Sequence, residues 1–144
     1  MARTLIAAAI AVGLLGACAT PGFRVFGATQ SCETPNCPIV EVTVEGNPPH
    51  LKASIDTLLM KHDNQNANIM WKLNAEGYKF QADSIAFKDP VRAATQFSLV
   101  NQTENMFHLK DKNKDDVYAY GYQIKVYEIA TGIWIALDPW VVNN

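Results

Sequence analysis

The chain lacks the parts of several familiar active sites. Three of its 144 residues are cysteines, and none lies beyond Cys37. A blue-copper centre needs a cysteine thiolate beside its histidines, so the absence of a late cysteine excludes one. The sequence also has no Gly-x-Ser-x-Gly, no glycine-rich phosphate loop and no His-Glu-x-x-His. These are local signatures of serine hydrolases, nucleotide-binding proteins and zinc peptidases. We therefore predict that the chain is not an enzyme and carries no cofactor.

A basic surface is missing as well. The chain has 12 Lys and Arg residues against 14 Asp and Glu residues, for a formal net charge of −2. A nucleic-acid-binding protein would gather its basic residues on one face, because phosphate contacts supply much of its affinity. We expect no nucleic-acid partner.

Hydrophobic runs are short. The run at Leu5–Leu15 has eleven residues and follows Arg3, whereas a membrane-spanning helix needs about 20. A basic start and an apolar run of this length are typical of a secretory signal. Leu15-Gly16-Ala17-Cys18 follows directly.

These four residues resemble the lipobox of bacterial lipoproteins. In that family the cysteine thiol is alkylated with diacylglycerol, the preceding peptide is removed, and the new N-terminus usually receives a further acyl chain such as palmitate. The resemblance implies a signal peptide over residues 1–17 and a lipid anchor on Cys18. Ala19 stands where the family's inner-membrane retention signal has Asp, which implies the outer membrane, with the protein on its periplasmic side. The alternative is ordinary cleavage after Ala17 or Ala19, which would give a soluble periplasmic protein.

A lipidated Cys18 leaves Cys32 and Cys37 as a pair in an oxidising compartment. Pro35 and Asn36 favour a turn between them. We predict a disulfide that fastens a tether, residues 18–36, to the folded domain. A redox role is disfavoured because the spacing is not Cys-x-x-Cys.

Residues 37–144 consist of short alternating stretches separated by turn residues. Such alternation places every second side chain on one face of a strand. The clearest stretches contain Ile69, Trp71 and Leu73, and then Tyr118 to Val126. Residues 51–62 are also interpreted as strand. The residues expected on one face there are Ala53, Ile55, Thr57 and Leu59.

About eight such strands, with no long helical stripe, predict an all-β fold consisting of a single antiparallel β-sandwich. The Ile-x-Trp-x-Leu and Tyr-x-Tyr strands and the closing Leu137-Asp138-Pro139 resemble small secreted domains with cupredoxin-like or immunoglobulin-like sandwiches. The resemblance implies that fold for residues 37–144, without the copper centre.

Two Met-x-His pairs, Met60 with His62 and Met106 with His108, support an alternative function. Residues i and i+2 of a strand share a face, and thioether ligands suit Cu(I). Adjacent pairs would form a site for a periplasmic copper-handling protein. The simpler interpretation is that these side chains occupy a half-exposed sheet face.

Asp111-Lys112-Asn113-Lys114-Asp115 resembles the beginning of a calcium loop. The sixth position, however, is Asp116 instead of Gly, and the twelfth is Tyr122 instead of Glu. We expect a solvated turn.

The tyrosine stripe, Tyr118, Tyr120 and Tyr122, continues into core-type residues, so we expect it to be buried instead of forming a stacking platform. Trp134 and Trp140 are the expected exposed aromatic residues and candidate partner contacts.

Taken together, these features predict a non-catalytic envelope lipoprotein, attached to the membrane through its lipid, whose domain has a binding or structural role. Its partner would be an unknown envelope protein or glycan.

Overall fold

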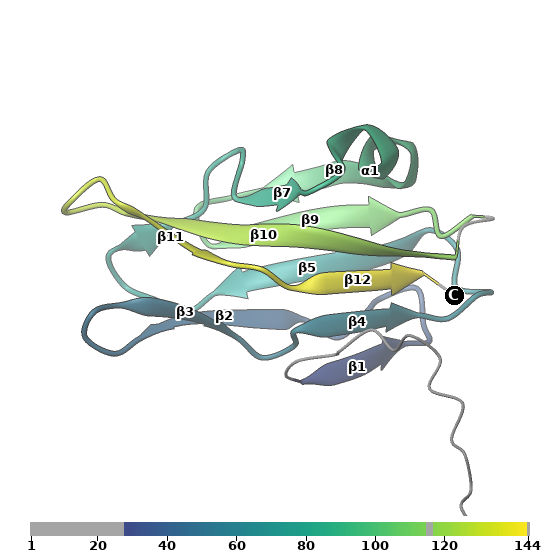
Figure 1. The fold of residues 1–144 in the computed structure, drawn as a ribbon, viewed down its shortest axis with the longest axis horizontal. Helices are drawn as coiled ribbons and strands as arrows, with labels where there is room; N and C mark the ends of the chain where they lie inside the picture. The colour runs from purple at the N-terminus through teal and green to yellow at the C-terminus, as the bar shows by residue number, and fades with distance from the viewer. Residues whose placement is uncertain (1–27, 115–116, 144) are drawn as a thin grey trace, which may run out of the picture.

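The computed structural model describes residues 28–114 and 117–143, and these form two β-sheets with one short helix (Figure 1). The signal peptide, Cys18 and the first part of the tether lie outside the described residues. The strands are β1 (Thr29–Cys32), β2 (Val40–Glu45), β3 (His50–Ala53), β4 (Thr57–Met60), β5 (Ala67–Leu73), β6 (Tyr78–Lys79), β7 (Ile85–Phe87), β8 (Phe97–Gln102), β9 (Met106–Asp111), β10 (Tyr118–Glu128), β11 (Trp134–Leu137) and β12 (Trp140–Asn143). The helix is α1 (Pro90–Gln96).

The larger sheet has seven strands in the order β1-β4-β12-β10-β11, with β6 and β7 also paired to β10. The smaller sheet has the order β3-β2-β5-β9-β8. The predominance of β-structure is confirmed. The prediction of antiparallel sheets is correct only in part, because both sheets are mixed: β1 pairs parallel with β4, β4 with β12, and β2 with β5, whereas the other pairings of the described strands are antiparallel. The alternation of side chains along a strand shows which residues share a face. It carries no information about whether the neighbouring strand runs parallel or antiparallel.

The sheets stack face to face over one core, in a sandwich-like arrangement. On β5 the predicted inward residues Ile69, Trp71 and Leu73 are buried, as are Tyr120 and Tyr122 on β10. The two strands supply the largest side chains of the core from opposite sheets. Burial of this apolar surface is the main stabilising contribution.

Residues 51–62 do not form one strand with one inward face. They divide into β3, in the five-stranded sheet, and β4, in the seven-stranded sheet. Leu58 and Met60 are buried in β4, whereas Leu59, which was expected to face inward with Ala53, is half-buried. Ala53, Ile55 and Thr57 are buried on one face as expected, and the inward set shifts by one residue between Thr57 and Leu58.

The disulfide between Cys32 and Cys37 is confirmed, and both cysteines are buried. Residues 29–32, assigned to the tether from the sequence, form β1 and pair with β4. The described part of the chain contains no helix long and apolar enough to cross a membrane.

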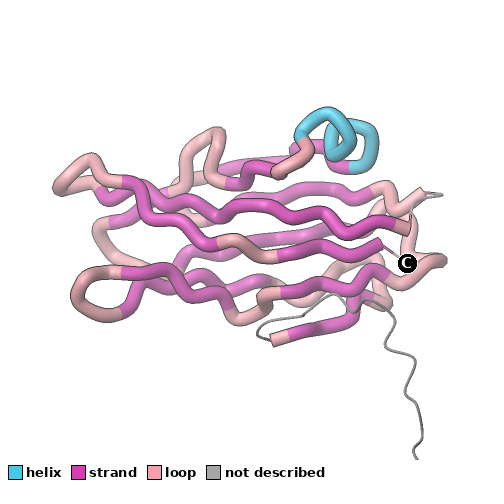
Figure 2. The backbone as a smooth tube through the Cα atoms, viewed as in Figure 1, coloured by secondary structure: helices cyan, strands magenta, loops and turns pink. Residues whose placement is uncertain are grey.

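The helix α1, cyan in Figure 2, was not expected from the sequence. Asp89 caps it by accepting a hydrogen bond from the backbone N–H of Arg92 at 3.0 Å, and Pro90 occupies the first turn. Both residues are typical of helix starts. Its seven residues are too few to show a helical period. The helix carries the chain from β7, in one sheet, to β8, in the other.

Candidate functional site

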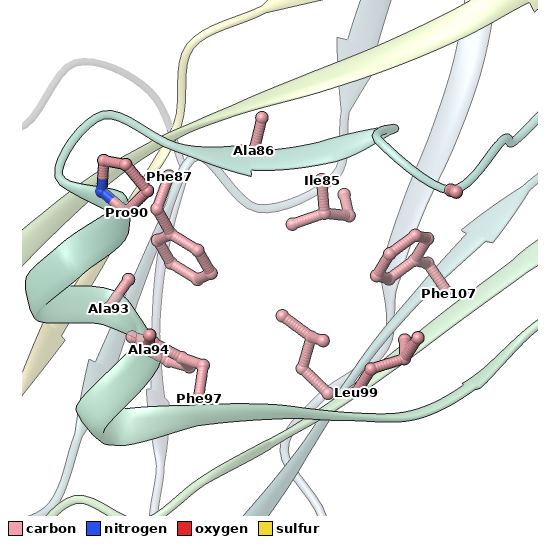
Figure 3. Close-up of a pocket in the computed structure, with 11 residues that line it drawn as sticks. Ile85, Ala86, Phe87, Pro90, Ala93, Ala94, Phe97, Leu99 and Phe107 are labelled. Carbon is pink, nitrogen blue, oxygen red and sulfur yellow. The ribbon is translucent and has the colours of Figure 1, made fainter.

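An apolar pocket of about 360 Å³ opens between the two sheets beside α1 (Figure 3). Strands β7 and β8 form its two sides. The lining residues are Ala82, Ile85, Ala86, Phe87, Pro90, Ala93, Ala94, Phe97, Leu99, Phe107 and Leu109. Figure 3 shows these side chains arranged around an open centre.

The pocket exists because the strands that border it, β7 and β8, belong to different sheets and do not pair with each other. The short strand β7 belongs to the seven-stranded sheet and β8 ends the five-stranded sheet, so no backbone ladder joins them. Phe87 and Phe97 stack across the gap, with ring centroids 4.3 Å apart and planes inclined by 20°. This aromatic pair joins the sheets at the end near α1. Beyond it the space is left open, since Ala93 and Ala94 of α1 project only methyl groups towards it.

The chemistry of the lining is uniform. Every side chain is a hydrocarbon, and none can titrate or donate a hydrogen bond. Binding pockets are commonly apolar with a few polar groups that orient the ligand. Here those polar groups must come from the backbone at the mouth. The pocket is therefore suited to burying hydrocarbon and has no side-chain means of acid–base or nucleophilic catalysis.

The mouth is formed by an edge strand. β8 pairs with β9 on one side, and the order of the sheet ends there. Leu99 is 59% exposed and Val100 is 50% exposed. An edge strand presents backbone N–H and C=O groups that another extended chain can pair with. An exposed apolar edge next to an apolar pocket is uncommon on a surface that touches only water.

The structure does not bring together the four Met and His residues of the proposed copper site. Met60 is buried in the seven-stranded sheet, where Cys37 Sγ lies 3.9 Å from its sulfur. His62 is exposed in the turn after β4. Met106 and His108 lie on β9 of the five-stranded sheet and alternate with buried residues, so they face outward as expected.

His108 has a structural partner on the outer face of the five-stranded sheet. Its Nε2 lies 3.1 Å from Oδ1 of Asn68 on the neighbouring strand. Desolvation, and secondarily the nearby Lys110 ammonium, lower the pKa of His108. Among residues 28–114 and 117–143 no three His, Cys, Asp or Glu side chains gather as a metal site would require.

The beginning of the calcium-like loop is held by its own side chains. The backbone N–H of Asn113 donates to Asp111 Oδ1 at 2.9 Å, and Asn113 Nδ2 donates to the carbonyl of Lys61 at 2.7 Å. Asp111 and Asn113 are both buried. The pair thus anchors the turn to the domain, whereas a solvated turn was expected. Asp115 and Asp116 lie outside the described residues.

Both predicted tryptophans lie on the outer face of the seven-stranded sheet. Trp134 is 38% exposed and meets the Tyr127 ring edge-on, with centroids 5.4 Å apart. Trp140 is half-buried and lies opposite Gly121 on the neighbouring strand. The two rings lie on different strands, and Trp140 lines a hollow.

Sequence reasoning missed the apolar pocket, because its lining residues come from four segments with no shared motif. The available signal was local: Pro90 after Asp89 is a helix start, and Ala93 and Ala94 follow it. A helix recognised there would have interrupted the expected succession of strands. No protein-family model matches the chain, and a search of curated proteins finds no match.

Proposed function

We propose that this chain is a lipoprotein of the outer membrane, attached by lipid on Cys18 and facing the periplasm, whose domain binds a partner protein without catalysis. The basic residue, the apolar run and the lipobox-like residues at its beginning support this location. The disulfide between Cys32 and Cys37 is in keeping with an oxidising compartment.

The observation that carries the binding function is the apolar pocket beside the exposed edge of β8. A ligand that fills the pocket must offer hydrocarbon, and one that also satisfies the edge must offer backbone groups in an extended conformation. A peptide strand with alternating apolar side chains offers both. One set of its side chains would enter the pocket while its backbone pairs with β8.

A lipid chain is less well matched to the same surface. It would fill the apolar pocket, but it has no donors or acceptors for the backbone of β8. It would also leave Leu99 and Val100, which are exposed at the edge, only partly covered. The copper-handling alternative has no geometric support, since Met60 and Met106 lie in different sheets.

We further propose that the fold is closer to a cupredoxin-like than to an immunoglobulin-like sandwich. The sheets of immunoglobulin domains are antiparallel, whereas three pairings here are parallel. No cysteine follows Cys37, so such a sandwich would lack the copper ligands of that fold.

The test has two steps. Site-specific cross-linking in cells identifies the partner segment at this edge, and the binding of that segment to the chain is then measured. A photo-reactive residue placed at Leu99 should capture a partner, while one placed at Met106, on the outer face of the same sheet, should not. A synthetic peptide of the captured segment should then protect the amides of Phe97–Gln102 from hydrogen exchange.

Leu99→Asp should weaken binding of that peptide by about tenfold or more, because the carboxylate would have to enter the pocket or block its mouth. Met106→Asp is the matched control and should change affinity by less than about twofold. Peptide binding that leaves the β8 amides unprotected, or capture that is equal from Leu99 and Met106, would reject strand addition at this edge.

A further inference from the structure

A second hollow, of about 210 Å³, lies beside β10, and its lining residues are all different from those of the apolar pocket. It is formed where β7 ends and the chain turns towards α1. The lining residues are Lys88, Asp89, Tyr118, Ala119, Tyr120, Gly121 and Trp140. Aromatic, charged and backbone groups thus meet in one place.

The ring of Trp140 lies directly on Gly121. A Cβ built on this glycine would be 3.2 Å from two carbons of the indole ring, and also 3.2 Å from Cδ of Lys88. A residue with a side chain at position 121 would therefore displace the ring or the lysine. Glycine lets the indole approach the strand closely, which holds a flat apolar surface at the border of the hollow.

The charged groups around the hollow balance one another. Lys88 Nζ lies 3.3 Å from Asp138 Oδ1 and 5.8 Å from the centre of the Trp140 ring. Asp89 uses Oδ1 to cap α1 and also lines the hollow. The guanidinium of Arg92 lies 3.7 Å from the centre of the Tyr118 ring, so two cations and two carboxylates surround the hollow and leave no excess of positive charge. A phosphate or another strong anion is therefore a poor match.

The backbone of β10 adds polar groups on the same side. The N–H of Lys88 donates to the carbonyl of Gly121 at 2.9 Å, so the backbone groups of Gly121 point towards the β7 side of the strand. Alternation along the strand directs the N–H and C=O of Ala119 to that side as well. Because β7 ends at Phe87, these groups of Ala119 face the hollow, where no β7 residue pairs with them.

From this arrangement we infer that the hollow binds a neutral saccharide. A sugar ring has an apolar face of C–H groups, which packs on an aromatic ring, and hydroxyl groups at its edge, which need both donors and acceptors. Trp140 supplies the ring. The ammonium group of Lys88 supplies a hydrogen-bond donor and the carboxylate of Asp89 an acceptor. The backbone of Ala119 supplies one donor, its N–H, and one acceptor, its C=O. This site is separate from the proposed peptide site and does not depend on it.

The test is calorimetric titration of the full-length chain with three soluble neutral probes: maltotriose, cellotriose and tri-N-acetylchitotriose. At least one should bind. Trp140→Ala should weaken its binding by about tenfold or more, since the stacking surface is lost. Trp134→Ala is the matched control, the same residue type on the same outer face, and it should leave affinity within about twofold of the unchanged chain.

Two further variants separate recognition from folding. Trp140→Phe keeps a stacking ring and should retain binding in part. Asp89→Asn keeps the helix cap, because Asn caps as well as Asp, and should weaken binding while leaving the melting temperature unchanged. The inference is overturned if none of the probes binds at millimolar concentration. It is also overturned if Trp140→Ala and Trp134→Ala have equal effects, or if only a protein partner requires Trp140.

Discussion

Trp71 and Tyr122 meet in the middle of the core, one from each sheet. The indole Nε1 donates a hydrogen bond to the phenolic oxygen at 3.1 Å, and the ring centroids lie 5.5 Å apart at 72°. Both side chains are fully buried. The contact therefore joins the two sheets by a polar interaction inside an apolar surrounding, where an unpaired donor would be costly.

Tyr122→Phe should lower the free energy of unfolding by about 1–3 kcal/mol, because the Trp71 N–H would lose its acceptor while remaining buried. Urea denaturation followed by tryptophan fluorescence measures the change. Tyr127→Phe on the outer face is the control and should change stability by less than about 0.5 kcal/mol. Equal midpoints for the two variants would show that the Trp71–Tyr122 bond does not stabilise the core.

The same tyrosine should make the domain sensitive to alkaline pH. Burial raises the pKa of Tyr122 well above its ordinary value of 10.0. The folded state therefore keeps a proton that the unfolded state releases, so the stabilisation is complete below about pH 10 and decreases as the pH rises further. The unfolding free energy, measured from neutral pH to pH 11, should fall less steeply above pH 10 in Tyr122→Phe. Parallel profiles for the two chains would contradict this assignment.

Filling the apolar pocket should leave the fold intact. Ala94→Leu adds hydrocarbon to the pocket at little cost in helix propensity, so stability should change by less than about 1 kcal/mol. The fluorescence of anilinonaphthalene sulfonate, a dye that reports accessible apolar surface, should decrease. Val91→Leu, on the exposed side of the same helix, should leave the dye signal unchanged. An undiminished signal in Ala94→Leu would mean that the dye does not use this pocket.

Removing the disulfide should weaken the domain by a limited amount. The loop between Cys32 and Cys37 is short, since the cysteines are five positions apart. Its closure entropy corresponds to about 2 kcal/mol. The double variant Cys32→Ala/Cys37→Ala should lose that amount in urea denaturation and become insensitive to dithiothreitol. A loss of folding at neutral pH would show that the disulfide contributes more than loop closure.

The lipid anchor can be tested by intact mass spectrometry of chain expressed in bacteria. We expect a species that begins at Cys18 and carries the added mass of diacylglycerol and a fatty acid, and that partitions into detergent. Cys18→Ala should lose the lipid mass. Cys37→Ala should keep it, which controls for the removal of a cysteine. A mature chain that begins elsewhere and carries no lipid would support the soluble periplasmic alternative.

The candidate site was less predictable from the sequence than the strands were. Ile69 and Trp71 on β5, and Tyr120 and Tyr122 on β10, were assigned to the core because alternation is a property of neighbouring residues. Phe87 and Phe97 gave no comparable signal. They are ten positions apart, and their stacking depends on a helix too short to show a period and on two strands that belong to different sheets. The copper-site hypothesis lacks geometric support for a related reason, because spacing within each Met-x-His pair says nothing about the distance between pairs.

The order of the amino acids is enough to predict local features: the β-rich character, the inward residues of the long strands, the Cys32–Cys37 pair and the absence of familiar catalytic motifs. Only the folded chain shows which strands are neighbours, in which direction they run, and that one edge stays open beside an apolar pocket. The physical reason is that the period of a strand follows from covalent geometry. Pairing, by contrast, depends on contacts between residues far apart in the chain, which become defined only when the whole core is packed.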